Sequence, residues 1–196
     1  VTEIKYTSAK YPLYFASEIK PFMNEEWFPQ ENAKQLNDQI PIDFDEKRME
    51  GELDSYLGQI IRKDLIDQFV IHVNETNLPL NSTIKTSEFE TNRFLIQKNG
   101  YYDKITLIEY ATFYGSIQIF NYLRLNNVEL KSSLWPFAVH SNNPELIHLL
   151  EENKVLPEDK TYEECFIEAI KCHHNNIVSY FENAYLKSIS SNMKKI

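Results

Sequence analysis

Short amphipathic helix pairs recur along the C-terminal half of this chain. The clearest pair lies in residues 106–123 (TLIEYATFYGSIQIFNYL), where apolar residues follow a helical period on both sides of a break at Gly115. Neither half is long enough to form a stable helix alone in water. We therefore expect the pair to be stabilised by packing against similar units of the same chain.

Two similar segments follow, at residues 133–150 (SLWPFAVHSNNPELIHLL) and 164–181 (ECFIEAIKCHHNNIVSYF). Each carries an alanine at the same place, since Ala138 lies 27 residues after Ala111 and Ala169 lies 31 residues after Ala138. A period of this size is typical of a repeat array. A small residue at one fixed position indicates helices that pack closely there, because a larger side chain would separate them.

Alignment on the alanines also brings the other apolar residues into register. The turn between the two helices then falls at Gly115, Asn142 and His173. The aligned apolar sets are Ile108, Trp135 and Phe166; Ile119, Leu146 and Ile177; Phe120, Ile147 and Val178; and Leu123, Leu150 and Phe181. The alignment predicts that these positions form a buried face in every segment.

These segments resemble the ankyrin repeat. Residues 106–111 (TLIEYA) correspond to that family's T-P-L-H-x-A opening, and residues 115–123 (GSIQIFNYL) correspond to its second helix. Leu107, Glu109 and Ser116 depart from the Pro, His and His of the family pattern. The chain is similar in particular to divergent ankyrin domains of parasitic flagellate protists. The resemblance implies an all-α, ankyrin-like α-solenoid of stacked helix-turn-helix repeats.

The resemblance and the breaks in the pattern together suggest a domain organisation. We expect an N-terminal helical segment over residues 1–50 that is a possible degenerate leading repeat, a divergent helical repeat with a long insert over 51–104, three ankyrin-like repeats over 105–187, and a frayed tail over 188–196. Because the chain has only four glycines, we also expect the β-hairpin fingers of ankyrin repeats to be short or absent.

Some individual elements can be placed inside these segments. We expect Pro21 to divide the first segment into helices over residues 12–19 and 21–28. In the second segment we expect a turn at residues 62–64, with Asp64 as the N-cap of the following helix. In the long insert we expect a helix over residues 87–97, which is either a packing helix or a functional element.

The charge of the chain excludes some partners. The formal net charge is −9, whereas nucleic acids and anionic membrane surfaces bind clustered Lys and Arg side chains. No apolar run is long enough to span a bilayer, so we expect no membrane insertion. Cys165 and Cys172 would lie about two helical turns apart, beyond the reach of a disulfide. Free thiols favour a reducing compartment, and we expect an intracellular, cytoplasmic protein.

The residues Cys172, His173 and His174, with Cys165 upstream, are of types that bind metal ions. Consecutive helical residues point about 100° apart, however, so these three cannot reach one ion together. His140 is expected at the protein surface, and the chain contains no G-x-S-x-G, P-loop, G-x-G-x-x-G or H-E-x-x-H motif. We therefore expect no metal, no cofactor and no catalytic residue, so that the protein is not an enzyme.

The resemblance to ankyrin repeats implies that residues beside the turns face a concave groove. These candidate partner-binding residues are Phe113, Tyr114, His140, Ser141, Lys171 and Cys172. Aromatic residues are good interface anchors. We expect a non-catalytic protein-protein interaction module, a scaffold or adaptor, whose unidentified protein partner has a basic or mixed-charge surface. The alternative is a structural subunit of a larger cytoskeletal or membrane-associated assembly, and the oligomeric state stays open.

Overall fold

The computed structural model of the chain describes residues 15–19, 21, 44–46, 55–84, 92, 95 and 105–186. The chain divides into two compact units, one of Val1–Ser55 with Thr86–Tyr102 and one of Tyr56–Lys85 with Asp103–Ile196. The described elements are helices apart from two strands of two residues each, so the predicted all-α class is confirmed. None of the described helices combines the length and the apolar composition needed to cross a bilayer.

In the first unit the structure describes helix α2 (Ala16–Ile19) and a buried aromatic ring, Phe44. Ser17 Oγ donates a hydrogen bond to the carboxylate of Asp45. Helix α2 agrees with the end of the helix predicted over residues 12–19. The other predictions for residues 1–50, the helix over 87–97 and the tail over 188–196 lie outside the described residues, apart from Pro21, Asn92 and Leu95.

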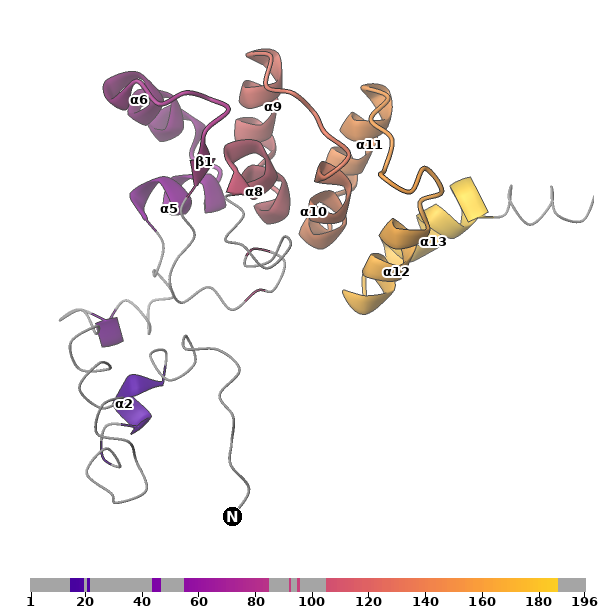
Figure 1. Cartoon of the computed structure of the whole chain (residues 1–196), viewed down its shortest axis with the longest axis horizontal. Helices are drawn as coiled ribbons and strands as arrows, with labels where there is room; N and C mark the ends of the chain where they lie inside the picture. The colour runs from indigo at the N-terminus through magenta and orange to yellow at the C-terminus, as the bar shows by residue number, and fades with distance from the viewer. Residues whose placement is uncertain are drawn as a thin grey trace, which may run out of the picture. The chain divides into compact units, whose positions relative to one another are not determined.

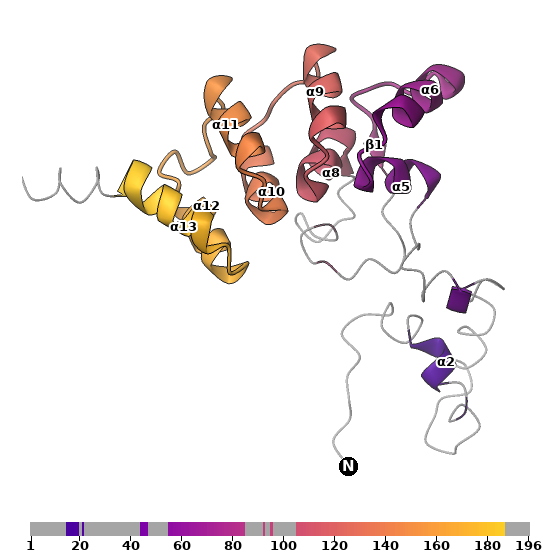
Figure 2. The same cartoon turned by 180° about the vertical axis from the view of Figure 1, so that it is seen from behind.

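In the described part of the second unit, the helices form four successive pairs (Figure 1). The pairs are α5 (Tyr56–Arg62) with α6 (Ile66–Thr76), α8 (Leu107–Tyr114) with α9 (Ile117–Leu125), α10 (Leu134–Ser141) with α11 (Pro144–Glu152), and α12 (Glu163–Lys171) with α13 (Asn175–Phe181), which the π-helix η2 (Glu182–Leu186) follows. The first helices pack in a row, because α8 contacts α5 and α10, and α10 contacts α12. Figure 2 shows the same row from behind, with α6, α9 and α11 along one side of it.

The predicted turn position is confirmed in all three C-terminal pairs. Gly115, Asn142 and His173 adopt left-handed backbone conformations, with φ angles of 72°, 53° and 58°. Asp64 takes the same conformation between α5 and α6, with φ of 51°. Glycine adopts this conformation most easily and Asn or Asp tolerate it, whereas for His173 the cost is greater. The pair α5–α6 therefore shares the turn geometry of the other three.

Asp64 does not cap α6 as we predicted. The N-cap of that helix is Leu65, which makes no capping hydrogen bond through its side chain. The Asp64 carboxylate instead accepts hydrogen bonds from the backbone N–H groups of Gln118 and Ile119, both at 3.0 Å. It therefore caps α9 in the next pair, at the positive end of that helix.

A second polar contact also joins neighbouring pairs. In each of the three C-terminal pairs, the side chain of the residue after the turn bonds to a backbone carbonyl oxygen of the preceding pair. These bonds link Ser116 Oγ to Ile61 O, Asn143 Nδ2 to Gly115 O at 3.5 Å, and His174 Nδ1 to Val139 O at 2.8 Å. Such bonds satisfy carbonyl groups near the helix ends and fix how far one pair can slide along the next.

The core lies between the pairs, as the alignment predicted. Ala111, Ala138 and Ala169 are each 0% exposed and occupy matching places in α8, α10 and α12. The aligned apolar residues are also buried, except that Phe166 and Val178 in the last pair are only half-buried. The last pair is therefore less completely covered than the two before it.

The only strands in the described residues form a single short ribbon. Strand β1 (Thr83–Ile84) pairs antiparallel with β2 (Ile105–Thr106), with Thr83 opposite Thr106. Thr106 is also the N-cap of α8 and forms a capping box with Glu109. The ribbon precedes α8, and residues 107–186 contain no strand.

The packing around Ala138 leads to a first prediction. Replacing it with leucine should lower the free energy of unfolding by about 1–3 kcal/mol, because extra methylene groups in a filled core force its neighbours apart. Urea denaturation measures this change. Ala184→Leu in η2 is the matched control, since Ala184 is exposed and should tolerate the larger side chain. Equal midpoints for the two variants would contradict close packing at Ala138.

Candidate functional site

The six predicted partner-binding residues lie at the C-terminal ends of three first helices. Phe113 and Tyr114 end α8, His140 and Ser141 end α10, Lys171 ends α12 and Cys172 is its C-cap. The ends of α8 and α12 both neighbour the end of α10, since these helices pack in a row. The regular packing of the pairs therefore brings most of these side chains together.

An aromatic group occupies the α8 side of this region. The Phe113 ring lies 5.4 Å from the His140 ring at an interplanar angle of 31°, and 5.1 Å from the Tyr114 ring at 79°. Tyr114 also contacts Tyr110, at 4.8 Å between ring centroids. The Arg62 guanidinium of α5 lies 5.3 Å from the centroid of the Tyr114 ring, within the range of a cation–π contact. Phe113 is therefore packed against His140 of α10, and Tyr114 is packed against Arg62 of α5.

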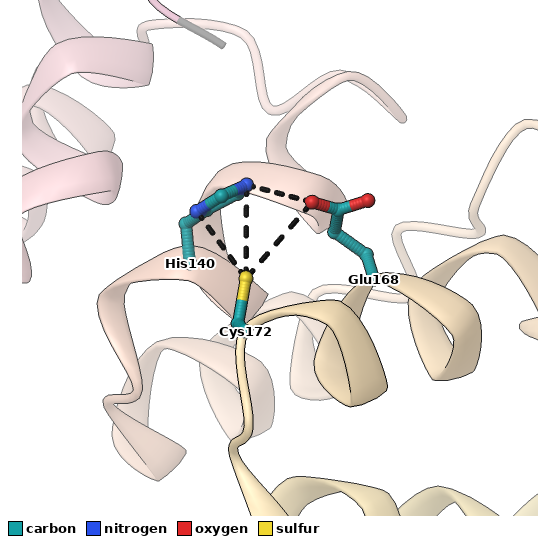
Figure 3. A group of neighbouring side chains, drawn as sticks. All are labelled: His140, Glu168 and Cys172. Carbon is teal, nitrogen blue, oxygen red and sulfur yellow. Dashed lines mark hydrogen bonds and ion pairs between the residues drawn. The ribbon is translucent and has the colours of Figure 1, made fainter. Parts of the chain in front are cut away.

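A polar cluster of three side chains occupies the α12 side (Figure 3). His140 Nε2 lies 2.9 Å from Glu168 Oε1. Cys172 Sγ lies 3.5 Å from His140 Nδ1 and 3.9 Å from both His140 Nε2 and Glu168 Oε1. The Lys171 ammonium group binds the other carboxylate oxygen, Glu168 Oε2, at 3.1 Å. Glu168 thus joins His140, Lys171 and Cys172 into one group.

Ser141 does not join this group. Its hydroxyl donates a hydrogen bond to Ala138 O at 2.7 Å and accepts one from the Asn143 backbone N–H at 3.2 Å. Both bonds are local to the turn after α10, so Ser141 completes a helix end. The structure therefore brings five of the six predicted residues together.

The protonation states of the cluster follow from its burial. Burial lowers the pKa of His140 more than the nearby Glu168 carboxylate raises it, so the imidazole is neutral at pH 7. Burial, and then the Glu168 charge, raise the pKa of Cys172, which is therefore a thiol at that pH. Since a carboxylate only accepts hydrogen bonds, His140 Nε2–H donates to Glu168, while the Cys172 thiol lies beside the imidazole ring at similar distances from both of its nitrogens.

His140 is less exposed than a surface position implies. The side chains of His140 and Glu168 are only 16% and 17% exposed. The alignment placed His140 at the end of a helix but gave no information on which residue of the next pair would face it. His148, by contrast, is exposed, and it contacts Glu151 on the second helix α11.

Glu168 is the member of the cluster that sequence reasoning missed. It aligns with Tyr110 and Phe137, which are 1% and 3% exposed and belong to the core. A carboxylate at a position that is aromatic in the other repeats is a signal of a polar function. Its spacing of four residues from Cys172 also places both side chains on one helix face.

The metal-ligand types noted in the sequence do not converge as a consecutive set. Cys165 is 2% exposed inside α12, and burial raises its pKa to about 12. His173 is exposed in the turn, and His174 bonds to the backbone of the preceding pair. Both cysteines are free thiols, as predicted. Cys172 alone of these residues joins the cluster with His140 and Glu168.

The order thiol, imidazole and carboxylate is that of a nucleophile, its base and the group that orients the base. Two features disfavour nucleophilic attack here. The pKa of Cys172 is raised, whereas activated thiols have lowered values. The N–H groups of Cys172, His173 and His174 donate to carbonyl groups at the end of α12, at 2.9, 3.0 and 3.0 Å, so they are not directed at a developing oxyanion.

The two thiols should differ in reactivity. With a maleimide at pH 7, Cys172 should be labelled first, because it is half-buried whereas Cys165 is enclosed in α12. Mass spectrometry of the native protein should find one label, which the Cys172→Ala variant loses and the Cys165→Ala variant keeps. Labelling of Cys165 at the same rate would mean that α12 does not pack as described.

No protein-family model, no curated protein and no solved structure matches the chain. A function for it is therefore inferred from its own residues and their geometry.

Proposed function

We propose that the chain is a non-catalytic protein-interaction module, a divergent ankyrin-repeat scaffold or adaptor, that binds a partner protein along the ends of its first helices. The binding surface, called here the end strip, consists of Phe113, Tyr114, His140, Lys171 and Cys172. The observation that carries the proposal is a continuous line of contacts across α8, α10 and α12, in which Lys171 is joined to the others through Glu168.

The contrast between constant and variable positions supports this assignment. The turn residues share one backbone conformation and the alanines of the first helices are all fully buried. At the positions two and three residues after each alanine, the pairs instead carry Phe and Tyr, His and Ser, and Lys and Cys. A repeat array with a uniform core and varied residues along one edge can bind a specific extended partner.

The end strip is also suited to binding in energetic terms. Phe113 and Tyr114 are half-buried and held by neighbouring rings, so binding would immobilise them at little further entropic cost. Lys171 and Glu168 provide charges beside the aromatic group. Aromatic anchors with polar neighbours are typical of the residues that dominate interface energies.

The charge of the chain indicates the kind of partner. A net charge of −9 favours a partner with a basic or mixed-charge surface and speeds its encounter with the chain. Exposed charges are screened within about 8 Å at physiological ionic strength. Higher salt should therefore lower the association rate constant and leave the dissociation rate constant nearly unchanged.

The proposal is tested by alanine substitution in the end strip. A variant with Phe113, Tyr114, His140 and Lys171 all changed to alanine should lose at least about tenfold in affinity for a partner recovered by affinity capture, because a buried anchor contributes above about 1.4 kcal/mol. Isothermal titration calorimetry measures the affinity, and circular dichroism checks that the variant is folded.

The matched control changes exposed residues on the second helices, Gln118, Glu152 and Ser179, to alanine. This control should bind as the wild type does. If the end-strip variant is folded and keeps its full affinity, the binding surface has been assigned to the wrong edge of the array.

One observation favours the alternative of a structural subunit in a larger assembly. Ile167 and Ile170 on α12 are 50% and 49% exposed. Ile170 aligns with Thr112 and Val139, which are 0% exposed in the earlier pairs. An apolar residue at a position that is otherwise buried is what a helix covered by a further subunit would present.

This alternative makes a different prediction about salt. Association through the α12 face should persist at high salt, because it depends on apolar area rather than on charge, and it should be lost when Ile167 and Ile170 are both changed to glutamine. Sedimentation velocity of the wild-type protein and of this double variant, at low and at high salt, measures the association. A sedimentation coefficient that is the same for both proteins under all conditions would remove self-assembly through this face.

A further inference from the structure

We propose that His140, Glu168 and Cys172 form a binding site for a zinc ion that links α10 to α12. The three residues offer an imidazole nitrogen, a carboxylate oxygen and a thiol sulfur, and these atoms lie within 4.8 Å of one another (Figure 3). These are the three ligand types that zinc takes in proteins. The site differs from the consecutive Cys172, His173 and His174, because its ligands come from two helix pairs.

The distances between the ligand atoms fit a tetrahedral ion. Zinc bonds of about 2.0–2.3 Å imply separations of about 3.4–3.6 Å between ligand atoms. The observed separations are 2.9 Å from His140 Nε2 to Glu168 Oε1, and 3.9 Å from Cys172 Sγ to each of those two atoms. Cys172 Sγ also lies 3.5 Å from His140 Nδ1 and so faces the side of the imidazole ring, which means that an entering ion requires the ring to turn until the Nε2 lone pair points between the carboxylate and the thiol.

The local field also favours a cation. His140 lies in the last turn of α10, Glu168 lies in the last turn of α12, and Cys172 is the C-cap of α12. The C-terminal end of a helix carries a partial negative charge, so two such ends and one carboxylate meet at this point. A bound divalent ion would be stabilised by this negative charge and would favour the thiolate form of Cys172, which is the form that ligates metals.

One neighbour opposes metal binding. The Lys171 ammonium group lies 3.1 Å from Glu168 Oε2, so it competes with an ion for the same carboxylate. The Lys171 side chain is 65% exposed and can turn into solvent, and Oε1 faces the imidazole and thiol rather than the lysine. Zinc sites with three protein ligands leave a fourth position for water or another ligand.

A bound ion would act on the stability of the array. Its ligands lie on α10 and α12, so it would connect the third pair to the incompletely covered fourth pair. A ligand that binds only the folded chain raises the free energy of unfolding in proportion to the logarithm of its concentration. This inference does not depend on partner binding, since the ion is bound by the isolated chain.

The test uses Co²⁺ as a spectroscopic substitute for Zn²⁺. Titration of the metal-free full chain with Co²⁺ should produce thiolate-to-cobalt charge-transfer absorption and the intense visible bands of a tetrahedral site, saturating at one ion per chain. Zn²⁺ should abolish these bands by displacement. Zn²⁺ should also protect Cys172 of the wild-type protein from maleimide labelling.

Variants assign the ligands. Cys172→Ser should lose the charge-transfer band, and Cys172→Ser, His140→Gln and Glu168→Gln should each weaken Co²⁺ binding by at least about 100-fold, the upper end of the loss seen when groups outside the ligand sphere are changed. Lys171→Met should bind Co²⁺ more tightly than the wild type, because it removes the competing cation. Cys165→Ser and His148→Ala are the matched controls and should bind as the wild type does.

Several outcomes would overturn the proposal. These are the absence of a charge-transfer band in the wild type, its persistence in Cys172→Ser, its loss in Cys165→Ser, or Lys171→Met binding more weakly than the wild type. If a ligand variant fails to fold, the labelling experiment on the wild-type protein decides, because Cys172 that is labelled equally fast with and without Zn²⁺ cannot be a ligand.

Discussion

The packing of each helix pair against the next is the interaction on which this structure depends. The paired helices have between 7 and 11 residues, and helices of this length are marginal alone in water. Ala111, Ala138 and Ala169 allow the first helices to approach closely, since each is completely buried. Polar bonds from the residue after each turn then fix the register between pairs. Stability and geometry are therefore set at the boundaries between pairs.

The same boundaries create the candidate site. Phe113 and His140 meet because α8 packs on α10, and His140 meets Glu168 because α10 packs on α12. No single repeat contains the end strip or the cluster. A ligand that contacts residues of two neighbouring pairs is consequently coupled to their packing, because arrays of this kind are stabilised largely by nearest-neighbour interfaces. The residues that would bind a ligand at this edge are therefore also residues that hold neighbouring pairs together.

How far the sequence could predict this structure depends on whether a signal is local. The turn at Gly115, Asn142 and His173 and the buried apolar positions follow from the repeat period and were predicted. The cap supplied by Asp64 was not predicted, because its carboxylate accepts hydrogen bonds from backbone N–H groups of α9, which belongs to another pair. Glu168 was missed for the same reason, since its partner His140 lies 28 residues away on a different helix. Side-chain pairing across a boundary requires the register between pairs, which the period alone does not give.

The boundary between the third and fourth pairs is more polar than the earlier ones. Glu168 replaces the buried aromatic residues of the earlier first helices, and the Tyr180 and Tyr185 hydroxyls both donate to Glu151 of α11. Burial, and then the bond to Glu151, raise the pKa of Tyr180 to about 12, so the hydroxyl stays protonated and keeps donating. Hydrogen bonds at partly solvent-exposed sites make only a modest net contribution to the free energy of unfolding. That contribution also changes with nearby ions and charges more than the contribution of buried apolar contacts does. The fourth pair is therefore the part of the array whose attachment a bound ion or a charged partner can alter most.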